Sequence, residues 1–115
     1  MTPWGRPDHK ETLAPGIVRM DTPSHGGYRV TGEALAVIQG RFPTHQPFAG
    51  EGWYEEDQDW AIVALTFPDL FPAECQEQAR QTVQYSAQPF QGRRDRGWEG
   101  VALALGIDTT INKES

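Results

Sequence analysis

The sequence predicts an α+β fold, a small single domain in which a β-hairpin packs against about three helices. Three observations support this prediction. A glycine-rich turn lies between two short apolar segments, as in a hairpin. Three other segments combine helix-forming residues with start or stop signals. The length of 115 residues allows one modest core and is too short for two.

Residues 16–30 predict the hairpin. The first strand, residues 16–21, has Ile17-Val18 and Met20 as its apolar part. Residues 22–27 are turn-forming throughout, because proline fixes φ, serine can bond its own backbone and the glycine pair permits positive φ. Residues 28–30 then alternate as a returning strand does.

Helices are expected near residues 32–39, 57–67 and 73–88. Thr31 is a suitable N-cap for the first of them, and Gly40 is a suitable stop. The segment 57–67 fits both the spacing of a helix face and the alternation of a strand. We prefer the helix, with the strand as its alternative. The segment 73–88 is rich in alanine, glutamate, glutamine and arginine, which all favour helix.

The domain is expected to span residues 15–107. Residues 1–14 are predicted to form a polar N-terminal arm, with Trp4 as its only tryptophan, tyrosine or phenylalanine. Residues 91–100 are expected to be a basic connector, followed by a short apolar element at 101–107. Residues 108–115 are predicted to form a tail.

The expected core consists of apolar residues from the hairpin and the helices. These residues are Ile17, Val18, Val30, Leu35, Ile38, Trp60, Val63, Leu65, Phe67, Phe71 and Val83.

Several classes of protein are not supported by the composition. No window approaches 18 consecutive apolar residues, so no membrane span is expected. The first residues lack the basic and apolar regions of a signal peptide. The single Cys75 excludes an internal disulfide. A cytoplasmic protein without a cofactor is the expectation.

The acidity of the chain is concentrated in one segment. Residues 51–77 carry eight acidic and no basic side chains, while the formal net charge of the whole chain is −6. Such a segment disfavours contact with nucleic-acid phosphates and favours a basic protein surface or a metal ion. We therefore expect a basic surface of a host or element protein as the partner, and no direct binding of nucleic acid.

The candidate site combines the acidic segment with the hairpin turn. Its first part holds two tryptophans, a tyrosine and five carboxylates within residues 51–60, and aromatic residues supply large contact areas. We expect the two loops to form one surface that binds the partner. Its residues are His25, Gly26, Gly27, Trp53, Tyr54, Glu55, Glu56, Asp57 and Asp59.

The alternative is a metal-dependent, hydrolase-like enzyme. It would use His25 with the carboxylates of Glu55, Glu56 and Asp57, and His45 is a further candidate ligand. The spacing of these residues matches neither an EF-hand loop nor a His-x₃-His pair. We therefore prefer an interaction protein over an enzyme.

Several short motifs in the sequence resemble those of a small uncharacterised domain family. They are Trp4-Gly5, Leu13-Ala14-Pro15-Gly16-Ile17-Val18, Ser24-His25-Gly26-Gly27, Gly52-Trp53-Tyr54-Glu55-Glu56-Asp57, Trp60-Ala61 and Phe67-Pro68. The resemblance covers roughly residues 3–72, and its members occur in plasmids, integrated elements and phages of proteobacteria. It implies no catalytic residue. It implies a setting among the accessory genes of mobile elements, where the expected role is an inhibitor of a host nucleic-acid-handling defence system.

Overall fold

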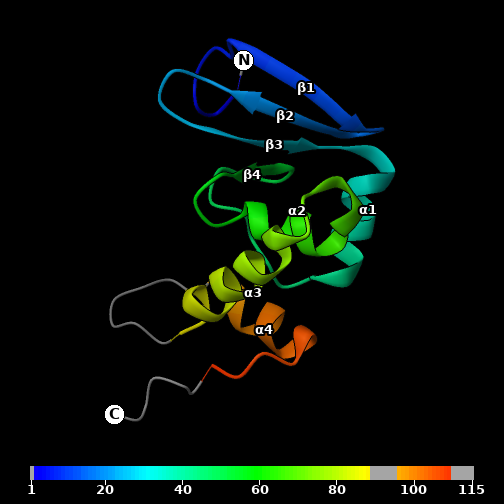
Figure 1. The fold of residues 1–115 in the computed structure, drawn as a ribbon, viewed down its shortest axis with the longest axis vertical. Coiled ribbons are helices and arrows are strands. Elements are labelled where there is room, and N and C mark those ends of the chain that lie inside the picture. Colours follow the sequence, from blue (N-terminus) through cyan, green and yellow to red (C-terminus); the bar gives the residue numbers. More distant parts are fainter. Residues whose placement is uncertain (1, 89–95, 110–115) are drawn as a thin grey trace.

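A four-stranded antiparallel sheet and four helices form one α+β domain, as the sequence predicts (Figure 1). The computed structural model describes residues 2–88 and 96–109. The strand order β1-β2-β3-β4 follows the sequence. The sheet lies at one end of the long axis of the molecule, and α3 and α4 lie at the other. Strand β4 is therefore nearest to the helices, and β1 is farthest from them.

The predicted hairpin is confirmed as β2 (Ile17–Asp21) and β3 (Gly26–Val30). The two strands pair from Ile17 opposite Val30 to Asp21 opposite Gly26. Its turn is shorter than expected, because Gly26 and Gly27 belong to β3. Thr22 closes this turn with two hydrogen bonds to the carbonyl oxygen of His25, from its backbone N–H at 2.7 Å and from its hydroxyl at 2.9 Å.

Part of the expected N-terminal arm is a strand. β1 (His9–Ala14) pairs with β2 from His9 opposite Asp21 to Ala14 opposite Ile17. Its first four side chains are polar and exposed. The strand is thus held by backbone pairing rather than by an apolar face, so the sequence pattern does not reveal it.

The acidic segment contains a further strand before its helix. β4 (Trp53–Glu55) pairs antiparallel with β3. The helix preferred for the segment that follows is confirmed as α2 (Trp60–Thr66), which begins three residues later than expected. Between β4 and α2, the Glu55 carboxylate accepts the N–H groups of Gln58 at 2.6 Å and Asp59 at 2.8 Å. This carboxylate fixes the turn that leads into the helix.

Two of the other helices confirm the expected ones, namely α1 (Gly32–Arg41) and α3 (Glu74–Ser86). The short 3₁₀ helix η1 (Pro68–Leu70) was not predicted. α4 (Trp98–Leu105) overlaps the short apolar element expected at 101–107, for which no helix was predicted. α4 begins within the expected basic connector at 91–100, whose first half lies outside the described residues. None of the helices in the described part of the chain is long and apolar enough to cross a membrane.

The core is centred on α2, where every residue from 61 to 65 is buried. Six of the expected core residues are buried, namely Ile17, Val30, Ile38, Val63, Leu65 and Val83. The expectation of full burial is wrong for Val18, Leu35, Trp60, Phe67 and Phe71, which are half-buried. The expected core did not include Phe42, Tyr54, Ile62, Trp98 and Val101, which are buried.

Trp98 should contribute more to stability than Trp60. Its side chain is 1% exposed, whereas Trp60 lies at the edge of the core against Phe71. Trp98→Ala is expected to lower the free energy of unfolding by about 3–5 kcal/mol. Trp60→Ala should cost roughly half of that, because a half-buried ring loses less transfer free energy. Chemical denaturation checks this order, and a larger loss for Trp60→Ala would contradict the described core.

Candidate functional site

The sheet brings the two predicted loops together. Gly27 pairs with Glu55, and the backbone N–H of Glu56 donates to the carbonyl oxygen of Gly26 at 3.0 Å. His25 lies exposed in the turn that immediately precedes this contact. The hairpin turn and the acidic turn are therefore neighbours at one end of the sheet.

Gly26 lies under a small group of ion pairs. Arg19 Nη2 is 2.7 Å from Asp21 Oδ1 and 3.2 Å from Glu56 Oε1. A Cβ atom at position 26 would lie 2.6 Å from that Asp21 oxygen and 2.9 Å from Arg19 Nη2. Hydrogen bonding to Asp21 and Tyr28 outweighs burial, which by itself lowers the pKa of Arg19, so the net shift is upward. The absence of a side chain at Gly26 gives the three charged groups room to meet.

Gly27 allows the N-terminal segment to cover the other face of the sheet. A Cβ atom there would lie 2.5 Å from Trp4 Cη2 and 2.6 Å from the carbonyl oxygen of Tyr54. Trp4 packs edge-on against Trp53, with 5.6 Å between the ring centroids. The Arg29 guanidinium lies 4.4 Å from the centroid of the Trp53 ring on the same face. Both glycines thus have a packing role that is independent of any ligand.

Only part of the predicted partner-binding surface is accessible. The expectation that Tyr54 and Asp59 lie on it is wrong, because their side chains are 2% and 0% exposed. Glu55 is half-buried, and its oxygens accept backbone N–H groups of the following turn. The residues of the predicted set that keep exposed or half-exposed side chains, other than Glu55, are His25, Trp53, Glu56 and Asp57.

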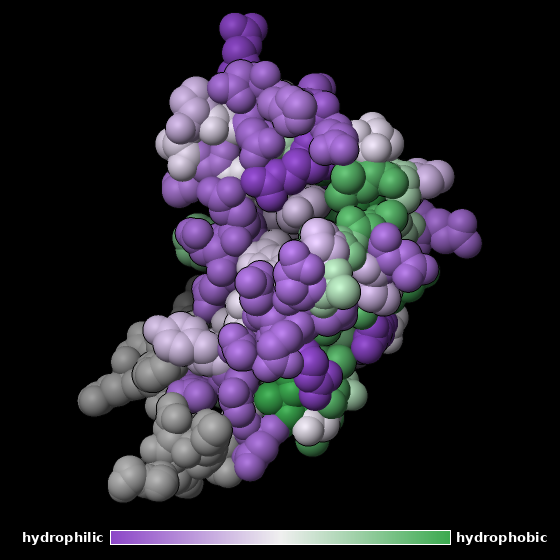
Figure 2. Space-filling model, in the orientation of Figure 1, coloured by the Kyte–Doolittle hydropathy of each residue, from purple (hydrophilic) through white to green (hydrophobic). Residues whose placement is uncertain are grey.

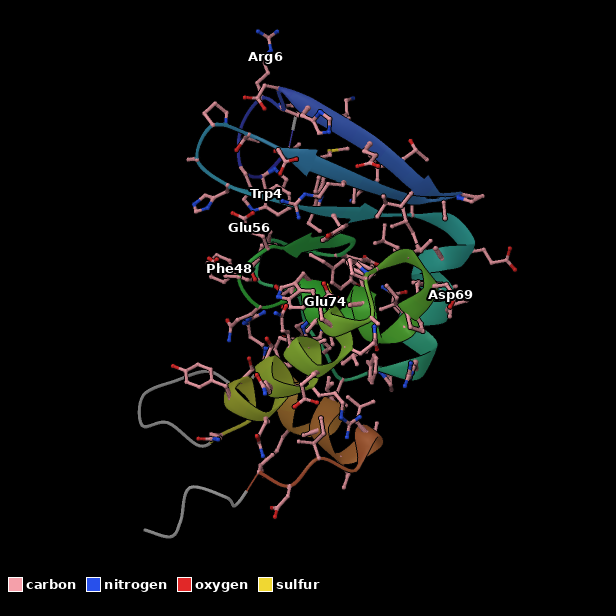
Figure 3. All side chains as sticks on the ribbon, viewed as in Figure 1. Trp4, Arg6, Phe48, Glu56, Asp69 and Glu74 are labelled. Carbon is pink, nitrogen blue, oxygen red and sulfur yellow. The ribbon has the colours of Figure 1, made fainter. Side chains whose placement is uncertain are left out.

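The acidic segment is not one continuous patch. Glu56 lies beside the sheet, Glu74 begins α3 and Asp69 lies in η1 (Figure 3). Figure 3 shows these three side chains at separate places on the molecule. The charge concentrated in the sequence is thus distributed over several surfaces by the fold.

Asp59 is the centre of a buried polar network. Its Oδ1 accepts a hydrogen bond from His45 Nε2 at 2.9 Å, and its Oδ2 accepts the backbone N–H of Phe48 at 2.9 Å. Arg96 Nη1 approaches both oxygens, at 3.2 and 3.4 Å. A carboxylate that is fully removed from water requires such partners, and this one has them from two segments, the loop after α1 and the residues before α4.

Arg96 extends the network to the loop and to α3. Its Nη1 also donates to the carbonyl oxygen of Gln46 at 2.8 Å, and its Nη2 lies 3.3 Å from Gln58 Oε1. Gln58 in turn donates from Nε2 to the hydroxyl of the buried Ser86 at 2.8 Å. The network therefore connects the loop after α1, the start of α2, the end of α3 and the residues before α4.

His45 is enclosed by two aromatic rings beside a cavity. It stacks on Tyr54 with 6.1 Å between centroids and meets the edge of Trp98 at 4.8 Å. His45 and Tyr54 line a cavity of about 340 Å³ together with Glu51. Burial, with the charges of Asp59 and Glu51, raises the pKa of Tyr54 to about 12. The hydroxyl of Tyr54 is therefore protonated at neutral pH.

The metal-ligating side chains that the hydrolase alternative requires are not brought together in the described part of the chain. Within the described residues, no three His, Cys, Asp or Glu side chains are grouped so that they could hold a metal ion. Two of the oxygen donors that the sequence suggests have other partners, since Glu55 binds backbone N–H groups and Glu56 pairs with Arg19. The geometry thus lends this alternative no support.

A second surface feature is an apolar groove of about 750 Å³, which shares none of its described lining residues with the cavity. Its lining comes from the β1–β2 turn, the first half of α1 and the segment from α2 to η1. Figure 2 shows apolar residues gathered over the region of α1. The charged residues among those that line the groove are Glu33 and Asp69, and both are exposed.

The substitution Asp59→Asn tests whether Asp59 has a structural role in the buried network or belongs to the partner-binding surface predicted from the sequence. Removal of the buried charge leaves Arg96 and His45 without their common partner, so the free energy of unfolding should fall by about 3 kcal/mol or more. Asp57→Asn is the matched control, because this neighbouring carboxylate is exposed and its loss should change stability by less than about 0.5 kcal/mol. Equal stability of the two variants in urea would contradict a structural role for Asp59.

Comparison with known proteins identifies one family and no characterised relative. No curated protein and no solved structure matches the chain. The model of a domain of unknown function, DUF7007, matches residues 1–91. This range contains the sheet, α1, α2 and α3, while Arg96 and α4 follow it. The chain therefore belongs to the DUF7007 family of domains of unknown function.

Proposed function

We propose that this chain is an acidic protein-interaction module that binds a basic segment of a partner protein. The observation that carries this proposal is the apolar groove with its acidic rim. The proposal extends to a role as inhibitor of a host nucleic-acid-handling system, in the cytoplasm, within the mobile-element setting that the sequence resemblance implies.

The walls of the groove suit apolar side chains of a partner. Ile17, Val37, Phe67 and Leu70 are among its lining residues, and Val37 is 48% exposed. A volume of about 750 Å³ lies within the range of protein ligand sites and accommodates a few side chains of a peptide. An amphipathic helix or strand commonly docks in a groove of this kind.

The charges at the rim of the groove indicate the sign of the charge that the partner segment carries. Glu33 and Asp69 flank the apolar walls, and the chain as a whole carries a formal net charge of −6. Complementary charges at the edge of an interface raise the association rate and disfavour wrong partners. We therefore infer a partner segment with an apolar face flanked by lysine or arginine.

This partner chemistry supports the inhibitor role. Proteins that handle nucleic acids expose lysine and arginine to bind phosphates. A module that covers such a segment with carboxylates would compete with the nucleic acid for it. The remaining exposed residues of the predicted loop surface, His25, Trp53, Glu56 and Asp57, are a second place at which the same partner class could bind.

Two model peptides test the partner class. Both form an amphipathic helix with leucines on one face, and the other face carries lysines in one peptide and glutamates in the other. The lysine peptide should shift the NMR signals of Val37 and Leu70, and Glu33→Lys with Asp69→Lys should weaken its binding at least about 10-fold. Glu56→Lys with Asp57→Lys is the control, since it makes the same charge change at the loop surface.

The outcomes separate the two surfaces. Loss of peptide binding in the control pair, with the groove pair unaffected, would place the interaction at the loops and contradict the groove. Equal binding of the lysine and glutamate peptides would contradict an acidic interaction module altogether.

The inhibitor role has its own experiment. A photo-crosslinking residue at Val37 should capture a basic partner from host extract, and the same residue at the exposed Leu103 should not. Duplex DNA should reduce the capture, because partner and DNA compete for the same basic segment. A partner whose capture is unaffected by DNA and by Glu33→Lys with Asp69→Lys would contradict the role.

A further inference from the structure

The cavity beside the buried Asp59 network has the composition of a ligand site. It lies between the second half of α1, the loop that follows and β4. Its volume of about 340 Å³ is at the small end of ligand pockets. Ile38, Phe42 and Pro47 give it apolar walls, and Glu51, His45 and Tyr54 give it polar groups.

Two of these polar groups are nearly fully buried and still lack partners at one atom. The side chain of His45 is 2% exposed, and Tyr54 is also 2% exposed. His45 Nε2 is bound to Asp59, and no residue of the described chain forms a hydrogen bond with His45 Nδ1 or the Tyr54 hydroxyl. In the same part of the chain, Trp98 Nε1 is the one fully enclosed side-chain nitrogen or oxygen without a partner. The other two atoms are therefore not fully enclosed, and both side chains line the cavity.

The network fixes the chemical character of these atoms. Asp59 accepts hydrogen bonds from Arg96 and the backbone N–H of Phe48, as an ionised carboxylate does. His45 Nε2 must then be the donor in its bond to Asp59, so Nδ1 of the neutral ring is an acceptor. The protonated hydroxyl of Tyr54 can donate a hydrogen bond or accept one.

Glu51 is the one carboxylate among the described residues that line the cavity, and no lysine or arginine is among them, although Arg29 Nη1 lies 3.4 Å from the backbone oxygen of Glu51. Arg96 balances Asp59 at the base of the network. Glu51 lines the cavity, and its Oε2 accepts a hydrogen bond from Gln39 Nε2 at 2.9 Å, which holds it in place. A carboxylate with aromatic rings beside it favours a cationic group.

We propose that this cavity binds a small organic amine in its protonated form. The ammonium group donates hydrogen bonds to Glu51 and His45 Nδ1, and the apolar body packs against Ile38, Phe42 and Pro47. Asp59 acts as a positioning residue, because it orients the imidazole so that Nδ1 remains an acceptor. This site is distinct from the groove, with which it shares no described lining residue.

Titration of the full chain with benzylamine tests the proposal, with benzyl alcohol as an uncharged probe of nearly the same shape. The ring signals of His45 and Tyr54 in NMR spectra should shift and saturate with benzylamine. Benzyl alcohol should bind at least about 10-fold more weakly, because it lacks the charge that Glu51 recognises. In Glu51→Gln the two probes should bind about equally, whereas Glu56→Gln, a control at an exposed carboxylate elsewhere, should keep the preference.

Three results would overturn the proposal. The first is that benzylamine gives no saturable shifts at His45 and Tyr54. The second is that the alcohol binds as well as the amine to the unmodified chain. The third is that Glu51→Gln keeps the preference for the amine. The backbone amide spectrum of each variant shows whether it is folded, and Glu51 is exposed, so its substitution should leave the fold intact.

Discussion

The buried carboxylate of Asp59 is the constraint on which the arrangement of the helices depends. A charge with no exposed surface is tolerated only when its hydrogen bonds are satisfied. The partners of Asp59 come from the loop after α1, which contains His45, and from Arg96, which precedes α4. The same loop is pressed against the start of α4, where a side chain at Gly97 would collide with the backbone of Thr44. The Asp59 carboxylate therefore links the part of the chain that matches the family to α4, the helix that follows it.

The residues that look most functional in the sequence have mainly structural roles at the far end of the sheet. Gly26 and Gly27 permit the close approach of Arg19 on one face and Trp4 on the other. Glu55 stabilises the turn into α2 by accepting backbone N–H groups. These contacts account for a dense cluster of glycines, aromatics and carboxylates without a ligand. The two features that suit a ligand or a partner are instead the cavity beside the second half of α1 and the groove beside its first half.

Local signals in the sequence were sufficient for the hairpin, α1 and α3, because turn residues and helix formers act over a few positions. They were insufficient for β1, whose exposed polar strand has no apolar alternation, and for β4, which is only three residues long. The ambiguity between helix and strand in α2 arose because its residues 61–65 are buried on all sides. The candidate site shows the same limit. His45 and Arg96 lie 14 and 37 residues from Asp59, and no local pattern links them.

The most direct test of the Asp59 network is to determine which ring nitrogen of His45 carries the proton. Long-range proton–nitrogen NMR correlations distinguish the two tautomers of a histidine ring. We expect Nε2 to carry the proton and Nδ1 to be bare in the neutral form, since Nε2 donates to Asp59. In Asp59→Asn this preference should weaken. A neutral ring of His45 with its proton on Nδ1, or a tautomer that is unchanged by Asp59→Asn, would contradict the account.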